Sequence, residues 1–191
     1  MPETPSMQVA LKEWAVLLEA MAAGRQIFLL RKGGIAEGSS GFELKHREFL
    51  FFPTWEHQQT AALQASYHDL LDQLQPPDPC TIEIRYAGQV EQIREAPRSL
   101  NEMAALDGQH IFTDAYLQKR YEYRPDLPLY IVVVRLMRLA GPVRILNERR
   151  YAGCRSWVDL AEPVETGELQ PVMKQAAFEA LLERLTTGLV A

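Results

Sequence analysis

The spacing of apolar residues along the chain predicts a helix at each of its ends. Residues 7–23 place apolar side chains close to helical intervals, with Ser6 as the N-cap and Gly24 as the stop. Residues 172–189 show the same periodicity and predict a closing amphipathic helix. The remaining helices are expected over 57–74, 100–106 and 112–121, the second of these with Ser99 as N-cap and Glu102 in a capping box.

Shorter apolar or alternating runs predict strands between these helices. The runs are 26–30, 42–46, 48–52, 81–85, 89–94, 129–139, 143–146 and 157–160. We expect 81–85 and 89–94 to pair as a hairpin, and 129–139 to be a central strand because it is β-branched and apolar. Helices and strands do not alternate strictly. The pattern therefore predicts an α+β fold, with a mixed or antiparallel sheet flanked by an N-terminal helix and a C-terminal helix.

The chain has 191 residues, which is enough for one sizeable core. We expect a single compact domain over 1–191, in which the proline-rich break at 75–79 would join possible subdomains 7–74 and 80–191. Two cysteines without CxxC spacing indicate reduced thiols. The longest apolar run, 129–134, is too short to span a membrane, and the first residues lack a signal-peptide pattern. These features predict a cytoplasmic protein with no membrane partner.

A first group of basic residues surrounds the glycine-rich turn at 33–41. Arg31 and Lys32 leave one predicted strand, and Lys45, His46 and Arg47 leave the next. A solvated hairpin end is the commoner explanation of such a group. The alternative is an anion or phosphate-backbone contact through Arg31, Lys32, Lys45 and Arg47.

The same stretch also permits a divalent-metal nuclease site. On a strand, Glu43 and Lys45 would share one face, so that the carboxylate holds Mg²⁺ or Mn²⁺ and the lysine orients the attacking water. Glu37 and His46 would complete the metal ligands, because the preceding strand contains no acidic residue. Under every other interpretation of the sequence we expect no cofactor.

A second basic region spans residues 114–155, where nine basic residues face four acidic ones, although the whole chain carries −5. Aromatic residues are interleaved with the arginines, an arrangement suited to phosphate contact and base stacking. Alternatively, the arginines pair with the acidic C-terminal part and stiffen the fold. The candidate phosphate ligands are Arg135, Arg138, Arg149, Arg150 and Arg155, and the candidate stacking residues are Tyr151 and Trp157.

The C-terminal part, residues 161–189, combines an acidic loop with the closing helix. This combination allows a third interpretation, in which the segment binds a protein partner and the protein serves as a scaffold.

Several stretches resemble a bacterial family catalogued as a domain of unknown function, DUF1802. They are "ALKEWAVLLEAM", "LLRKGGIAE", "FLFFPTWEHQ", "PLYIVVVRLMRL" and "YAGCRSWVDL", and the resemblance extends from about residue 10 to residue 160. The family has no established activity. Some members are joined to a restriction-endonuclease-like domain, so the resemblance implies a link to restriction or DNA processing. The leading interpretation of the sequence is therefore a non-catalytic module that associates with DNA or RNA, with the nuclease and the scaffold as alternatives.

Overall fold

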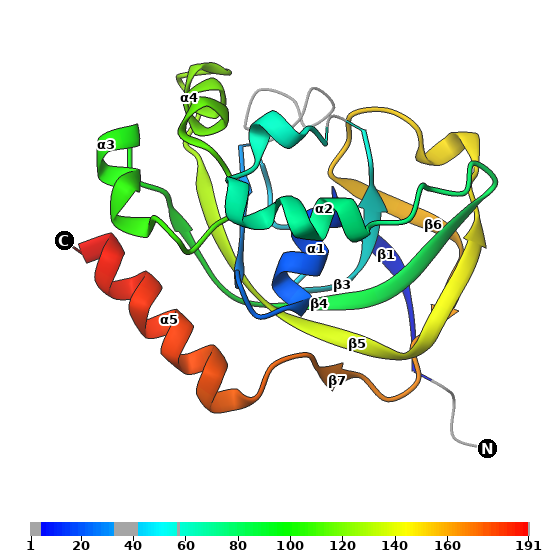
Figure 1. Ribbon diagram of the computed structural model, residues 1–191. Helices are drawn as coiled ribbons and strands as arrows, with labels where there is room; N and C mark the ends of the chain where they lie inside the picture. Colours follow the sequence, from blue (N-terminus) through cyan, green and yellow to red (C-terminus); the bar gives the residue numbers. More distant parts are fainter. Residues whose placement is uncertain (1–4, 33–41, 57, 191) are drawn as a thin grey trace.

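In the computed structural model, the described residues are 5–32, 42–56 and 58–190. Their strands form one seven-stranded mixed sheet in the order β2-β5-β4-β3-β1-β6, with β7 paired to β5 (Figure 1). The predicted α+β class is confirmed. The strands are β1 (Ser6–Trp14), β2 (Phe28–Arg31), β3 (Glu48–Thr54), β4 (Thr81–Glu95), β5 (Tyr130–Leu146), β6 (Trp157–Glu165) and β7 (Gln170–Pro171).

Five α-helices accompany the sheet in the described part of the chain. They are α1 (Ala15–Ala22), α2 (His68–Gln73), α3 (Leu100–Met103), α4 (Asp114–Glu122) and α5 (Gln175–Val190). Figure 1 shows α5 after β7 on the outside of the molecule, while α1 and α2 lie over the sheet. The closing helix predicted for 172–189 is confirmed. None of the described helices is long and apolar enough to cross a membrane.

The predicted N-terminal helix is wrong in its first half, because the chain begins with a strand. β1 pairs in parallel with β3 and antiparallel with β6, and α1 begins only at Ala15. The apolar residues Val9, Leu11 and Trp14 are spaced by two and three positions, which fits a strand as well as a helix. Pairing on both edges satisfies the backbone of β1, and this tertiary context decides between the two periods.

The predicted hairpin between 81–85 and 89–94 is also wrong. β4 runs without a turn through Gly88, and a Cβ at this position would lie 2.8 Å from ring carbons of Phe49 and Phe51. The glycine therefore makes room for two core rings instead of forming a turn. Likewise, 129–139 and 143–146 are parts of the single strand β5, and 161–165 belongs to β6 instead of an acidic loop.

The segment 42–46 is irregular instead of a strand, and 58–74 contains two short 3₁₀ turns before α2 instead of one helix. His57 and the turn at 33–41 lie outside the described residues. The caps were predicted more accurately. Ser99 accepts the Glu102 N–H at 3.3 Å, and the Glu102 carboxylate in turn accepts the Arg98 N–H at 2.9 Å.

The core lies on both faces of β3, because successive side chains of a strand point to opposite sides. Phe49 and Phe51 belong to the larger cluster, which also contains side chains of α1 and α5. Leu50 and Phe52 belong to a second cluster, which also contains side chains of β6 and of the N-terminal half of β4. The sheet is continuous across 75–79, since β3 pairs with β4; the division into subdomains there stays a prediction.

Candidate nucleic-acid interface

A cleft of about 240 Å³ opens where β1, β2 and β3 end. Further walls come from α4 and from residues 153–156, which lead into β6. The backbone brings these elements together, since Lys12 N–H donates to the Ser156 carbonyl at 2.8 Å. We call this opening the cationic cleft and define it by its basic side chains, Lys12, Arg31, Lys32, Arg120 and Arg155.

The cleft is cationic although the chain as a whole is acidic. Its five basic side chains face two acidic ones, Glu13 and Glu56, which leaves a local charge of +3 (5 − 2) in a protein of −5. This concentration of basic side chains marks the cleft as the candidate site.

Arg31 and Glu13 form an ion pair in the wall of the cleft. The guanidinium Nη2 lies 2.9 Å from Glu13 Oε2, and both side chains are nearly enclosed, at 13% and 12% exposure. The same Nη2 donates to the Lys12 carbonyl at 2.6 Å. Arg31 Nε is buried without a hydrogen-bond partner among the described residues. Arg31 Nη2 thus makes both of its contacts inside the protein.

The two lysines hold neighbouring elements in place. Lys32 Nζ donates to the carbonyls of Arg120 and Tyr121 at 3.0 and 2.9 Å, at the C-terminal end of α4, where carbonyls lack helical partners. Burial lowers the pKa of Lys32, and the nearby Arg120 lowers it further. Lys12 Nζ donates to the carbonyls of Tyr151 and Gly153. Burial also lowers the pKa of Lys12, against the opposing effect of Glu56.

Arg120 and Arg155 differ from the other three cations. Arg120 is half-buried on α4 and Arg155 is exposed before β6. No carboxylate within the described ranges lies at ion-pair distance from either guanidinium. These two groups are therefore free to contact an anion that enters the cleft.

Aromatic rings line the cleft beside these cations. Tyr116 stacks on Phe112, with ring centroids 4.7 Å apart, and Trp14 packs against Tyr116 at 5.2 Å. Burial raises the pKa of the Tyr116 hydroxyl. The three rings support one another and form a rigid wall that an apolar or aromatic ligand can contact.

The cleft unites part of both predicted basic regions, namely Arg31 and Lys32 of the first and Arg120 and Arg155 of the second. Arg120 belongs to the second region but was not among its candidate phosphate ligands. The other predicted ligands lie elsewhere. Arg135 pairs with Glu91 at 2.6 Å and stacks over Phe178 of α5. Arg150 pairs with Glu148 at 3.2 Å. The remaining four, Lys45, Arg47, Arg138 and Arg149, are exposed outside the cleft.

The predicted stacking residues take part in packing. Tyr151 is 3% exposed, packs against Phe52 and accepts the Ala161 N–H at 2.9 Å through its hydroxyl. Trp157 packs edge-on against Phe49, and its Nε1–H donates to the Glu43 carbonyl at 3.1 Å. Neither ring lines the cationic cleft.

The predicted nuclease residues lie in the irregular segment beside Trp157. Glu43 and Lys45 are exposed there, and the His46 ring contacts Trp157 with centroids 5.2 Å apart. Glu37 lies outside the described residues. Among the residues that are described, no group of three His, Cys, Asp or Glu side chains could hold a metal ion.

Sequence reasoning missed Lys12, Trp14 and Tyr116 as cleft residues. The first two lie in the second half of β1, a stretch that was interpreted as part of a helix. Tyr116 and Arg120 are spaced by four residues on α4 and therefore share one face of that helix. That spacing was visible in the sequence, but nothing local indicated which element the face would meet.

Fold and site together define an α+β protein with a cationic, aromatic-lined cleft at one end of a mixed sheet. The chain belongs to the DUF1802 family, the "Domain of unknown function (DUF1802)", whose family model matches residues 10–184. Among curated proteins, a search finds no match.

Solved structures of ASCH from Zymomonas mobilis show some similarity. One is 10% identical, with a TM-score of 0.40 over 94% of this chain and 93% of that chain. A serine-to-alanine mutant of the same protein is 9% identical, with a TM-score of 0.43 over 95% and 98%. At these values we draw no conclusion about this chain from the comparison.

Proposed function

We propose that this protein binds single-stranded nucleic acid through the cationic cleft. The observation that carries this proposal is the pair of guanidinium groups, on Arg120 and Arg155, that come from separate elements and have no carboxylate partner in the described structure. A guanidinium donates two parallel hydrogen bonds to a phosphate, which makes arginine well suited to this contact.

The aromatic wall favours a single strand over a duplex. Trp14 and Tyr116 are partly buried beside the cations, so a ligand must enter the cleft to reach them. A single strand can turn a base toward such a wall, while the bases of a duplex are stacked inside it. The phosphate contacts carry no sequence information, and the proposal therefore concerns RNA and DNA alike.

Nothing in the described part of the chain favours the divalent-metal nuclease, since Glu43 and Lys45 do not share a strand face and no metal-holding group is found. We therefore propose a binding module without a catalytic step.

A salt-series titration tests the proposal. Labelled twelve-residue oligouridylate and oligothymidylate are titrated with the protein by fluorescence anisotropy between 50 and 300 mM salt, with a duplex as competitor. We expect affinity to fall with salt along a slope of about −0.7 per phosphate contacted. The double variant Arg120→Glu/Arg155→Glu should bind at least about tenfold more weakly and lose roughly one unit or more of slope.

The control is the double variant Arg138→Glu/Arg149→Glu, which changes the net charge equally at two exposed arginines outside the cleft. It should bind almost as tightly as the unaltered protein. Equal losses in both double variants would contradict the proposal, because binding would then depend on net charge or on the predicted second region instead of the cleft.

A further inference from the structure

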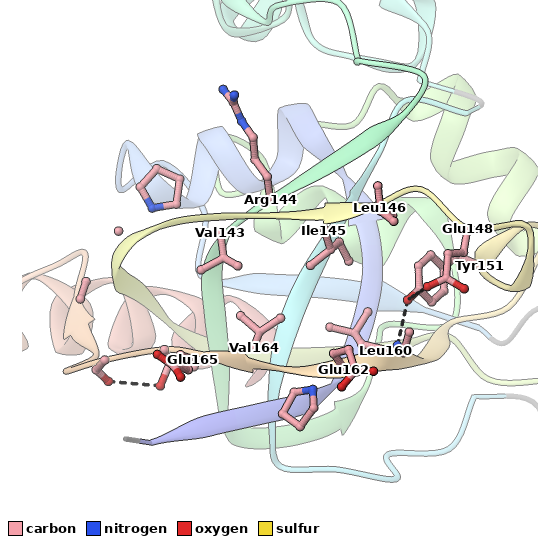
Figure 2. A pocket seen from close by; sticks show the side chains of 17 residues that line it. Val143, Arg144, Ile145, Leu146, Glu148, Tyr151, Leu160, Glu162, Val164 and Glu165 are labelled. Carbon is pink, nitrogen blue, oxygen red and sulfur yellow. Dashed lines mark hydrogen bonds between the residues drawn. The ribbon is translucent and has the colours of Figure 1, made fainter. Parts of the chain in front are cut away.

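A second opening lies between β5 and β6, and its lining shares no residue with that of the cationic cleft. It is a groove of about 770 Å³ between residues 140–146 at the end of β5 and residues 160–167 of β6 and the turn after it, with Glu148 and Tyr151 at one end. Figure 2 shows the two segments running along opposite sides of the groove. We call this groove the seam.

The edge of β5 that faces the seam already binds two other strands. β4 pairs along the opposite edge with residues 130–138 and 143–146. On the seam side, β2 pairs with residues 130–133 and β7 with residues 137–138. Residues 143–146 continue the same edge, and no strand in the described ranges pairs with them there. The edge thus has a third position that is open.

The main-chain groups of Arg144 and Leu146 point toward this open position. The Asn147 N–H donates to the Cys80 carbonyl at 2.8 Å, and the register pairs Ile145 with Ile82 and Val143 with Ile84. In an antiparallel pair, every second residue bonds to the partner strand. The odd-numbered residues therefore face β4, while the N–H and C=O groups of Arg144 and Leu146 face away from it.

The floor of the seam is apolar. Val143 and Ile145 extend into it from β5, and Leu160 and Val164 extend toward them from β6 (Figure 2). The side chains from β6 are buried, while those from β5 are only half-buried. Leu146 points to the same side of β5 as Arg144 (Figure 2), and it is 70% exposed. An additional strand would cover the side chains of Val143 and Ile145.

The rim of the seam is acidic. Glu148, Glu162 and Glu165 lie along it. Arg144 is the one basic residue in its lining, and its side chain points away from the groove and pairs with Glu83 at 3.0 Å (Figure 2). Glu148 pairs with Arg150, but Glu162 and Glu165 have no ion-pair partner in the described ranges. These two carboxylates would repel the phosphates of a nucleic acid and attract a basic partner.

We propose that the seam binds an extended peptide of alternating apolar and basic residues from a protein partner, which adds as a strand to the edge of β5. Its backbone pairs with Arg144 and Leu146, its apolar side chains cover Val143 and Ile145, and its basic side chains meet the acidic rim. Strand addition of this kind takes its affinity from main-chain hydrogen bonds and its specificity from alternate side chains. A second copy of this chain is disfavoured, because it would place the same glutamates against each other.

The test uses two synthetic probes of equal charge, an acetylated Lys-Val-Lys-Val-Lys-Val-Lys amide and the same peptide with proline at each valine. Proline removes the backbone donors that a strand needs. Hydrogen exchange of the protein, followed residue by residue by NMR, reports the contact. We expect the valine peptide to slow exchange of the Arg144 and Leu146 amides at least about tenfold, and the proline peptide to leave both unchanged.

Two variants complete the test. Glu162→Lys/Glu165→Lys should lower the affinity for the valine peptide at least about tenfold, because the rim becomes basic. Leu146→Pro removes a donor that faces the seam and none that faces β4, so it should weaken the peptide more than Leu146→Ala does. Equal binding of both peptides, binding without protection at Arg144 and Leu146, or binding that the glutamate reversals leave unchanged would overturn the proposal. Concentration-dependent dimers that the reversals dissociate would also overturn it, in favour of a second copy.

Discussion

The cationic cleft and the seam are openings of the same sheet with opposite chemistry. In the cleft, polar side chains are held by an ion pair and by lysines that donate to carbonyls, and two arginines remain without described acidic partners. In the seam, the floor is apolar, no described strand pairs with the outer edge of residues 143–146, and the rim is acidic. A net charge of −5 therefore describes neither surface. The comparison shows that local segregation of charge decides which ligand each opening can bind.

The largest expected effect concerns the nearly enclosed ion pair between Arg31 and Glu13 in the wall of the cleft. Glu13→Met leaves the Arg31 guanidinium enclosed without its carboxylate, and we expect it to lower the free energy of unfolding by about 3 kcal/mol. This value is at the low end for such a loss because both side chains retain some exposure. Urea denaturation measures the change.

The matched control is the double variant Glu13→Met/Arg31→Met, which removes both charges and keeps the volume. Its loss of stability should be smaller than that of Glu13→Met alone, since no uncompensated charge remains. If the double variant lost as much stability as the two single variants lose together, or more, the pair would not stabilise the cleft wall.

A smaller effect follows from the imidazole behind the aromatic wall. His110 is buried, its Nδ1 accepts the Phe112 N–H at 3.2 Å, and its Nε2 has no partner in the described structure. Burial lowers the pKa of His110, against the opposing effects of Asp107 and Asp114. The unfolded chain therefore takes up a proton near the ordinary pKa of about 6.5, while the folded protein still excludes it.

The stabilisation from neutral His110 is thus fully present above that pKa and is lost as the pH falls below it. We expect the free energy of unfolding to decrease between pH 7 and pH 5, by at most about 1.4 kcal/mol per pH unit from this group. His110→Asn keeps an acceptor for the Phe112 N–H and should flatten the slope, whereas His68→Gln should retain it. Identical slopes in all three proteins would exclude His110 as the cause.

The smallest effect on stability is expected at the rim of the seam. Leu146→Lys replaces a side chain that is 70% exposed, so the free energy of unfolding should change by less than about 0.5 kcal/mol. The same substitution should lower the affinity for the valine peptide several-fold, because it adds a cation and removes an apolar contact. A large loss of stability, seen by thermal denaturation, would show that Leu146 supports the core instead of a partner site.

Strong local signals explain what the sequence predicted correctly. The β-branched run of β5, the apolar run of β3, the cap at Ser99 and the periodicity of α5 each specify their element without distant contacts. Gly88 shows the limit of such signals, because a glycine between two strand-like runs usually indicates a turn. Its actual cause lies in Phe49 and Phe51 of another strand.

The candidate site could be predicted only in part, because local signals in the sequence indicate only some of its residues. Arg31, Lys32, Arg120 and Arg155 belong to dense basic stretches that composition reveals. Lys12 joins them only because β1 pairs with β6, and Arg120 reaches the cleft only because Lys32 holds the end of α4. Such long-range pairing has no local signature in a single sequence. The open edge of β5 was hidden likewise, since only the sheet order reveals it.

The most direct test of the account is a crossed charge reversal with both probes. Arg120→Glu/Arg155→Glu and Glu162→Lys/Glu165→Lys are each titrated with labelled oligouridylate and with the valine peptide at 150 mM salt, where distant charges are largely screened. We predict that the arginine reversals lower the affinity for the oligonucleotide at least about tenfold and change the affinity for the peptide by no more than about twofold. The glutamate reversals should do the opposite. If either pair weakened both probes equally, the cleft and the seam would not be separate sites, and the account would be contradicted.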